Sequence, residues 1–167
     1  RGVARTLQDL TDEILAGEAT LALLRECNVV RVDVRHIDDE GREYKLREDH
    51  QDFFYTRQPF ATRSDWRVER TRRRPTNWAI WEKHPVSEAP LDAAKRAVCE
   101  ELGLCGDLNL RAEDVTEEME PPMDYPGVST RLRASNFTLL LSKAQYDPSG
   151  YVEPADDKRT VFVWDKA

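Results

Sequence analysis

The sequence predicts an α/β fold built around a mixed central β-sheet. Residues 28–37 alternate between apolar and polar side chains, which is the period of two expected for a β-strand. Residues 90–102 repeat their apolar side chains at helical spacing instead. Residues 131–142 include a continuous apolar run, which is typical of a buried central strand. Strands that precede and follow one amphipathic helix fit a layered α/β architecture.

The N-terminal segment is expected to add a second helix. Across residues 6–26 the leucines and isoleucine recur at helical spacing, so one stripe of this segment is apolar. We therefore divide the chain into an N-terminal helical extension, residues 1–27, and a main domain, residues 28–167. The stripe consists of Leu7, Leu10, Ile14, Leu21 and Leu24.

Turns and further strands follow the first strand in order. Residues 38–41 read Asp-Asp-Glu-Gly, which predicts a hairpin turn. Residues 43–56 hold the return strand, with room for a second strand. Residues 59–64 are expected to be a loop, and residues 66–70 alternate as another strand.

Two segments after the helix are expected to be irregular. Residues 107–125 are acidic and show no clear period. Residues 146–157 contain two prolines and a glycine, which predicts a loop. Residues 160–164 alternate as a final strand.

The helix at residues 90–102 has clear start and stop signals. Pro90 suits a first helical turn, where a missing N–H costs little. Gly103 suits the left-handed residue that ends a helix. Positions 97, 100 and 101 are three and four residues apart, so we expect them to share one exposed face. The expected buried stripe consists of Leu91, Ala94, Val98 and Leu102.

A motif spans this helix and the loop before it. Residues 82–104 read EKHPVSEAPLDAAKRAVCEELGL. This stretch is similar to the Nudix box, G-x5-E-x7-R-E-U-x-E-E-x-G-U, where U is a bulky apolar residue. On that alignment Glu88 takes the first glutamate position, Arg96 the arginine, and Glu100 with Glu101 the acidic pair.

Two positions depart from the Nudix pattern. Glu82 stands where the opening glycine belongs, and Ala97 stands where the family has a metal-ligand glutamate. The Pro-Gly-Gly that often precedes the box is replaced by Trp81, Glu82 and Lys83. Because glycine permits backbone conformations that these residues adopt less easily, we expect a loop of different shape.

The resemblance implies a fold and a site. The fold is a Nudix-like α/β/α sandwich with a mixed central sheet over residues 28–167, to which the N-terminal helix is an addition. Glu88 and Arg96 are expected to form a structural ion pair between the loop and the helix. Glu100 and Glu101 are expected to be the catalytic and metal-binding residues, with Mg²⁺ as the cofactor and Mn²⁺ as a substitute.

The resemblance leaves the function open between two classes. The first is a Mg²⁺-dependent pyrophosphohydrolase that acts on a nucleoside diphosphate linked to another group. The second is a catalytically silent Nudix-fold domain, a pseudoenzyme, that senses a nucleotide or serves as a scaffold for another protein. Because Ala97 replaces a metal ligand, the sequence does not decide whether the chain is an enzyme. An unrelated α/β binding domain with a chance match is a third reading.

A basic run before the box supplies the candidate substrate-binding residues, Arg72, Arg73 and Arg74. Arginine forks suit phosphate oxygens, and a solvated hairpin tip is the alternative interpretation. Acidic residues beyond the helix could supply the missing carboxylate, and a charged surface loop is the alternative there. The acidic candidates are Glu113, Asp114, Glu117, Glu118, Glu120 and Glu153. Aromatic candidates for stacking on a base, which could instead be core residues, are Phe54, Trp78, Trp81 and Tyr125.

Composition limits the class of protein. The 167 residues, 40% hydrophobic and 34% charged, fit one globular domain. The net charge of −7 argues against broad nucleic-acid binding, and no apolar run is long enough to span a membrane. No signal peptide is visible, so we expect a cytoplasmic protein whose cysteines, Cys27, Cys99 and Cys105, are free thiols. A start at Arg1 without methionine is what an excised domain of a larger parent chain would have.

Overall fold

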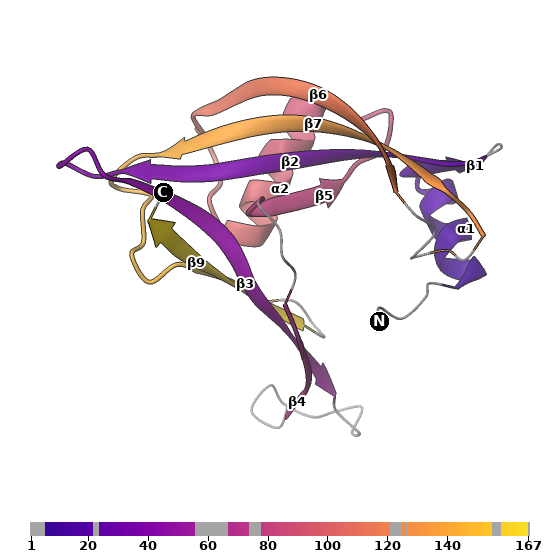
Figure 1. Ribbon diagram of the computed structural model, residues 1–167, viewed down its shortest axis with the longest axis horizontal. Helices are drawn as coiled ribbons and strands as arrows, with labels where there is room; N and C mark the ends of the chain where they lie inside the picture. The colour runs from indigo at the N-terminus through magenta and orange to yellow at the C-terminus, as the bar shows by residue number, and fades with distance from the viewer. Residues whose placement is uncertain are drawn as a thin grey trace.

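One mixed β-sheet and two helices make up the part of the chain that the computed structural model describes, which is residues 6–21, 24–55, 67–73, 78–120, 125, 127–154 and 158–166 (Figure 1). The mixed α/β class expected from the sequence is therefore confirmed. In chain order the elements are α1 (Leu7–Leu15), β1 (Ala19–Leu21), β2 (Arg25–Ile37), β3 (Glu43–Tyr55), β4 (Arg67–Arg72), β5 (Ile80–Lys83), α2 (Pro90–Leu102), β6 (Leu110–Glu120), β7 (Thr130–Leu141), β8 (Tyr151–Pro154) and β9 (Lys158–Lys166).

The parallel pair of β2 and β7 forms the centre of the sheet. The strand order is β6-β7-β2-β3-β9-β8, and every other described pair is antiparallel. The second edge of β2 is shared in turn by β1, β5 and β3. β3 then diverges from β2, and β4 pairs with its far end (Figure 1).

The helix α2 packs closely on the sheet because its buried face is built mainly from alanine. Ala93, Ala94 and Ala97 have no exposed surface, and such small side chains let the helix backbone approach the strands. The helix begins at Pro90 and ends before Gly103, whose φ is 70°, so its predicted bounds are confirmed. The residues that it covers include Val30, Val32, Val34, Leu46, Ile80, Phe137, Leu139 and Phe162.

The buried face of α2 is rotated from the one that the sequence suggested. Leu91, expected in the buried stripe, is 42% exposed. Ala97, expected on the exposed face with the acidic pair, lies in the hydrophobic core. The reason is the alanine content, since the adjacent positions Ala93 and Ala94, and then Ala97 and Val98, can all contact the sheet at once. The prediction for Ala94, Val98 and Leu102, which are buried, was correct.

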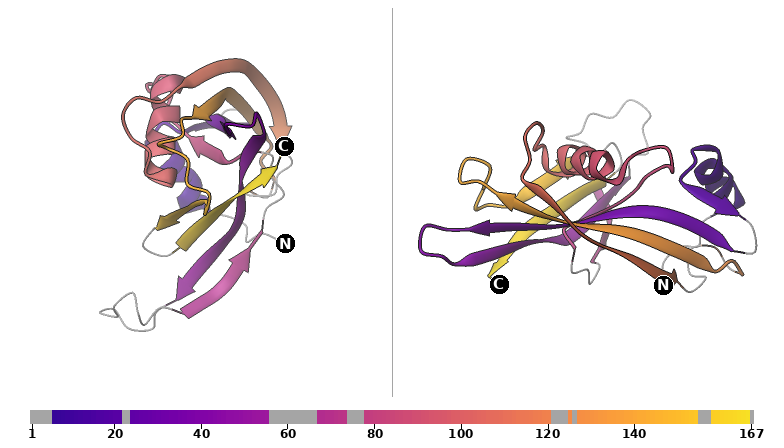
Figure 2. Two further views of the ribbon diagram at one scale, coloured as in Figure 1. Left: turned by 90° about the vertical axis from the view of Figure 1, so that its left-hand side faces the viewer. Right: turned by 90° about the horizontal axis from the view of Figure 1, so that it is seen from above.

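Both helices lie on the same side of the sheet, with α1 beside the start of β2 and α2 over the centre (Figure 2, right). The sequence predicted helical elements on the opposite face as well. The described residues contain no helix there, so in that part of the chain the second face of the sheet is not covered by a helical layer.

The N-terminal helix is shorter than expected. It ends at Leu15, and Gly17 has a φ of 74°, a left-handed conformation that stops a helix. The chain then forms β1, which pairs with the first residues of β2, so the domain boundary predicted after residue 27 falls inside β2. A buried ion pair between Glu13 and Arg25, 2.5 Å apart, fastens α1 to the sheet.

Two segments that were expected to be irregular are strands. β6 pairs with β7, and its side chains are nearly all exposed, so the segment carries no apolar period to mark it. β8 pairs with β9 at the end of the strand order, an edge position at which Pro154 can be tolerated. β3 is a single strand over residues 43–55 rather than two. The loop expected at residues 59–64 lies outside the described residues.

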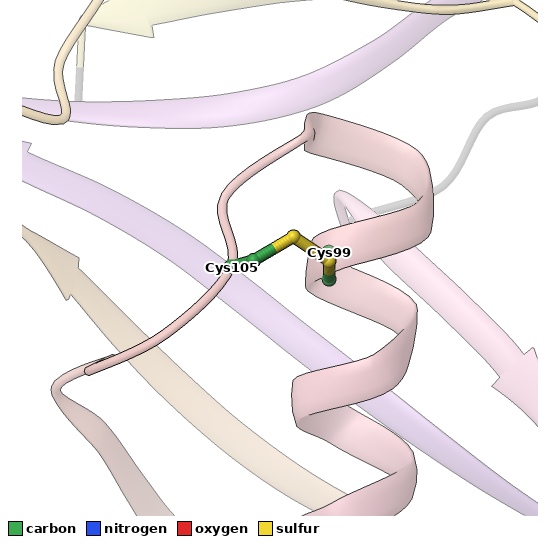
Figure 3. The surroundings of a disulfide bond; sticks show 2 residues. All are labelled: Cys99 and Cys105. Atoms are coloured by element: carbon green, nitrogen blue, oxygen red, sulfur yellow. A yellow bond between two sulfur atoms is a disulfide. The ribbon is translucent and has the colours of Figure 1, made fainter.

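Cys99 and Cys105 are joined by a disulfide, contrary to the expectation of free thiols (Figure 3). Gly103 turns the chain back from the end of α2, which brings the two Cα atoms to 4.7 Å from each other. Cys27 is free and buried, so for this residue the prediction is confirmed.

Arg96 ties α2 to the loop and the strand that precede it. Its Nε lies 3.0 Å from Glu88 Oε1 and a terminal nitrogen lies 3.1 Å from Glu88 Oε2, so the predicted ion pair is formed and is bidentate. The same guanidinium donates to the Lys83 carbonyl at 3.3 Å and to Glu100 at 3.0 Å. Hydrogen bonding to Glu88 raises the pKa of Arg96, and the same bond lowers the pKa of Glu88.

Arg96→Ala should lower the free energy of unfolding by about 1–2 kcal/mol, because Glu88 is left half-buried and without its partner. The Arg96 side chain is 34% exposed, so solvent screening keeps the loss below that of a fully buried pair. Urea denaturation measures the change. Lys143→Ala is the matched control, since Lys143 and Asp39 form an ion pair that is almost fully exposed. Equal stability of the two variants would contradict the role assigned to Arg96.

Ala97→Glu should destabilise the protein by about 2–4 kcal/mol, because it places a carboxylate in the core under α2. The expected fall in melting temperature is roughly 5–15 °C for a chain of this size. Lys95→Glu, on the exposed face of the same helix, should leave the melting temperature almost unchanged. If Ala97→Glu has the same melting temperature as Lys95→Glu, position 97 is not part of the core.

Candidate functional site

The carboxyl group of Glu101, the second residue of the acidic pair, has a strongly raised pKa. It lies in the last turn of α2 and is largely buried, although carboxylates are rarely buried without a partner. Burial, which is the largest cause, and repulsion from Glu153, Glu82 and Glu48 together raise the pKa of Glu101 to about 8, while Lys158 opposes the rise. A carboxyl group held in this way carries a proton near neutral pH in the absence of a cation.

Four glutamates from four elements gather here, and we call Glu48, Glu82, Glu101 and Glu153 the carboxylate cluster. Glu48 comes from β3, Glu82 from β5, Glu101 from α2 and Glu153 from β8. The sheet brings β3 and β8 together through β9, which pairs with both. Burial raises the pKa of Glu82 also, with Arg96 acting against the rise.

Cationic and neutral side chains surround the cluster. Lys158, the first residue of β9, places its Nζ 3.6 Å from Glu153 Oε2. The Thr160 hydroxyl donates to the same oxygen at 2.8 Å. The buried amide of Gln51 lies between Thr160, at 3.4 Å, and Glu48, at 3.5 Å. The cluster is thus supported by polar groups of β3 and β9 that fix the directions of two of its carboxylates.

Arg72 is joined to this network, whereas its neighbour in the basic run is not. Arg72 donates to the side-chain amide oxygen of Gln51, Oε1, at 2.5 Å, which links the end of β4 to the cluster. Arg73 is 70% exposed and pairs with Asp49 instead. Arg74 lies outside the described residues. Of the three predicted substrate-binding arginines, Arg72 is therefore the one that the structure connects to the carboxylates.

Glu100 lies at the edge of the carboxylate cluster, where its charge contributes to the raised pKa of Glu82. Its side chain is 56% exposed and is held by Arg96 on the outer side of α2. The two residues were expected to act together on one face that also carried position 97. The rotation of α2 places Ala97 in the core and gives its two glutamates different surroundings.

The acidic run after the box is distant from the cluster in the sheet. These residues lie on β6, and β7 and β2 separate that strand from β3. Several of them have structural partners: Glu118 binds Arg31 at 2.7 Å, Asp114 accepts a hydrogen bond from Asn136 at 2.9 Å, and Glu113 pairs with Arg111 at 3.4 Å. Glu153 is the one downstream acidic candidate that joins the cluster. Glu48 and Glu82 were not predicted as site residues, because Glu48 lies outside the motif and Glu82 was noted only as a departure from its opening glycine.

The aromatic candidates pack against arginines. Arg31 lies 5.2 Å from the ring centre of Trp81 and 5.9 Å from that of Trp78. Arg159 lies 5.7 Å from the ring centre of Phe54, and Arg25 lies 4.9 Å from that of the buried Tyr125. Trp81 precedes Glu82 on β5, so its side chain points to the opposite face of the sheet.

The donor chemistry of the cluster suits a hard cation. Mg²⁺ and Mn²⁺ prefer carboxylate oxygens, and Mg²⁺ is commonly held by one or two carboxylates together with water and substrate phosphate. In the described part of the chain no three acidic, histidine or cysteine side chains already converge as a metal site. The carboxylates therefore have the right chemistry for such an ion. They would bind it together with substrate oxygens and do not form a complete metal site by themselves. Two cavities, of about 610 and 290 Å³, are lined by residues outside the cluster.

Comparison with known proteins adds no assignment. The chain matches no protein-family model, and it matches no curated protein sequence. Within the described residues, no helix is long and apolar enough to cross a membrane.

Proposed function

We propose that the protein is a Mg²⁺-dependent pyrophosphohydrolase of the Nudix type that acts on a nucleoside diphosphate linked to another group. The similarity of residues 82–104 to the Nudix box supports this proposal. The observation that carries it is the burial of Glu101 among the carboxylates of three other elements. Such an arrangement is unfavourable for an apo protein, and a bound cation would relieve the repulsion.

Each residue has a distinct role in this proposal. Glu101 and Glu153 hold the cation, with Glu48 as a further carboxylate on the sheet. When bound, Mg²⁺ supplies charge neutralisation at the diphosphate and lowers the pKa of a water molecule. Lys158 and Arg72 stand beside the carboxylates and bind the phosphate oxygens of the substrate. Mn²⁺ substitutes for Mg²⁺ because it accepts the same oxygen ligands.

A second function is favoured by two particular observations. Ala97 removes one box carboxylate, and the charge of the largely exposed Glu100 is paired with Arg96. Both reduce the number of anions available to a cation, so the alternative is a silent Nudix-fold domain that binds a nucleotide as a sensor or scaffold. In that case its partner is another protein or a larger parent chain. The cytoplasmic location expected from the sequence is also part of the proposal.

A phosphate-release screen separates the two functions. ADP-ribose, dinucleotides, nucleotide sugars and nucleoside triphosphates are incubated with the protein in Mg²⁺ or Mn²⁺. Glu101→Gln should lower kcat/KM about 100-fold or more, and Glu153→Gln about tenfold, because each removes a metal-binding charge. Glu113→Gln, on the exposed strand β6, is the control and should stay within about twofold of wild type. Turnover that persists in EDTA or in Glu101→Gln overturns the hydrolase proposal, whereas binding without turnover favours the sensor.

The raised pKa of Glu101 predicts how stability depends on pH without a cation. Between the ordinary pKa of 4.5 and the folded value of about 8, the unfolded chain releases a proton that the folded protein keeps. The free energy of unfolding must therefore fall as the pH rises through this window, by at most roughly 1.4 kcal/mol per pH unit. Glu101→Gln should remove this slope and be more stable than wild type at pH 8 in EDTA.

Urea denaturation across the same pH range measures the effect. Adding Mn²⁺ at pH 8 should restore wild-type stability and leave Glu101→Gln unaffected, since only the charged carboxylate binds the ion. If the free energy of unfolding depends on pH in the same way for wild type and Glu101→Gln, then Glu101 has an ordinary pKa and the neighbouring carboxylates do not act on it.

A further inference from the structure

We propose that Cys99 and Cys105 are a reversible thiol–disulfide exchange site for low-molecular-weight thiols and their disulfides, and that its redox state controls the order of the end of α2. The link to activity rests on the proposed function, because Glu101 lies inside the ring that the disulfide closes. The exchange reaction itself does not depend on that function.

The two disulfide-bonded cysteines are at least partly exposed to solvent, in contrast to the third cysteine. Cys105 is exposed and Cys99 is partly exposed at the end of α2 (Figure 3). Cys27 is 2% exposed, and burial raises the pKa of its thiol, which disfavours the reactive thiolate. A small thiol can therefore reach the disulfide while Cys27 stays unreactive in the folded protein.

The disulfide can open without unfolding the domain. It joins residues only six positions apart, so it restrains a short ring. The helix α2 is held independently by its buried face, which runs from Ala93 to Leu102. Opening is thus expected to be local, as it is for other segments with few buried contacts.

The last turn of α2 is held by Leu102 in the core and by the bond from Arg96 to Glu100, whereas the chain that follows Gly103 has fewer restraints. No basic side chain lies in that turn to bind its final carbonyl groups. The cap is the Gly103 N–H, which donates to the Cys99 carbonyl at 3.0 Å. Within the ring lie Glu100, Glu101 and the buried Leu102. Loss of the disulfide therefore loosens residues 103–106, directly after the turn that carries Glu101, while the buried face of the helix keeps its contacts.

The exchange reaction is a two-electron step in two stages. A thiolate RS⁻ attacks Cys105 Sγ, the Cys99–Cys105 bond breaks, and Cys99 leaves as a thiolate. A second RS⁻ attacks the RS sulfur of the mixed disulfide, which releases Cys105 as a thiolate and RSSR as the product. The protein disulfide is thus reduced to two thiols while two RSH are oxidised to RSSR, and the reverse reaction closes the ring.

The first test is equilibration of the purified, metal-free protein in mixtures of reduced and oxidised glutathione, followed by thiol alkylation and mass spectrometry. We expect Cys99 and Cys105 to be labelled together as one two-electron couple, with Cys27 labelled only after denaturation. Failure to interconvert without denaturant, or independent labelling of the two residues, would overturn the proposal.

The second test is hydrogen exchange on the oxidised and reduced forms. Amides of residues 102–106 should exchange at least about tenfold faster after reduction, whereas residues 93–98 should not change. Cys105→Ser should behave like the reduced form under oxidising conditions. Cys27→Ala is the control and should match wild type in both states. Equal exchange rates in the two states would contradict control of the helix end.

A final comparison measures the stabilisation that Mn²⁺ gives to each form at pH 8. The oxidised form should be stabilised more, because Glu101 is held in the cluster. If neither form responds to Mn²⁺, the proposed function fails, and the glutathione and exchange results still decide the redox proposal separately. If Mn²⁺ stabilises the oxidised and reduced forms equally, the redox state of Cys99 and Cys105 does not affect metal binding by the carboxylate cluster.

Discussion

The position of the candidate site depends on the contacts that Arg96 makes around the start of α2. The buried face of this helix is rich in alanine, and small side chains interlock weakly with a sheet, so they do little to fix how the helix is rotated. The N-cap residue, Ala89, offers no side-chain cap either. Arg96 supplies a fixed point by binding Glu88 of the loop and the Lys83 carbonyl of β5 at once. The rotation so defined places Ala97 in the core and Glu101 toward the carboxylate cluster.

Gathering the cluster has a thermodynamic cost. Glu101 and its three carboxylate neighbours repel one another, and Lys158 offsets this only in part. Residues that lower the stability of the apo fold are frequent at functional sites, where a ligand supplies what the protein lacks. The same protein also has a buried Glu13–Arg25 pair, in which opposite charges are matched and the pKa of Glu13 is lowered. The contrast suggests that unmatched burial at Glu101 serves binding rather than folding.

The parts of the fold with strong local signals could be predicted from the sequence. Pro90 and Gly103 set both ends of α2, and the apolar runs located β2 and β7. The extent of α1 was wrong because the apolar period continues past Gly17, although the left-handed glycine ends the helix there. β6 was missed because its backbone pairs with β7 while its side chains remain mostly exposed. A strand with no buried face does not need the alternation of apolar and polar residues by which strands are recognised in a sequence.

Site residues were predictable only where the motif contained them. The Glu88–Arg96 pair followed from spacing, since both ends belong to one loop–helix unit. Glu48 comes from a strand outside the motif, and Glu82 occupies the motif's glycine position, so the pattern assigned neither residue a role. The Cys99–Cys105 disulfide was missed for a related reason: six residues along a helix would separate the cysteines, and the reversal at Gly103 brings them together.

The most direct test of the account is a crystal structure of the protein with Mn²⁺ and a non-hydrolysable nucleoside diphosphate derivative, with the metal located by anomalous scattering. The account predicts a peak about 2.1 Å from a Glu101 oxygen, with Glu153 or Glu48 as a second ligand and the diphosphate completing the shell. A metal bound instead to the acidic side chains of β6, or a nucleotide bound with no ion near Glu101, would contradict it.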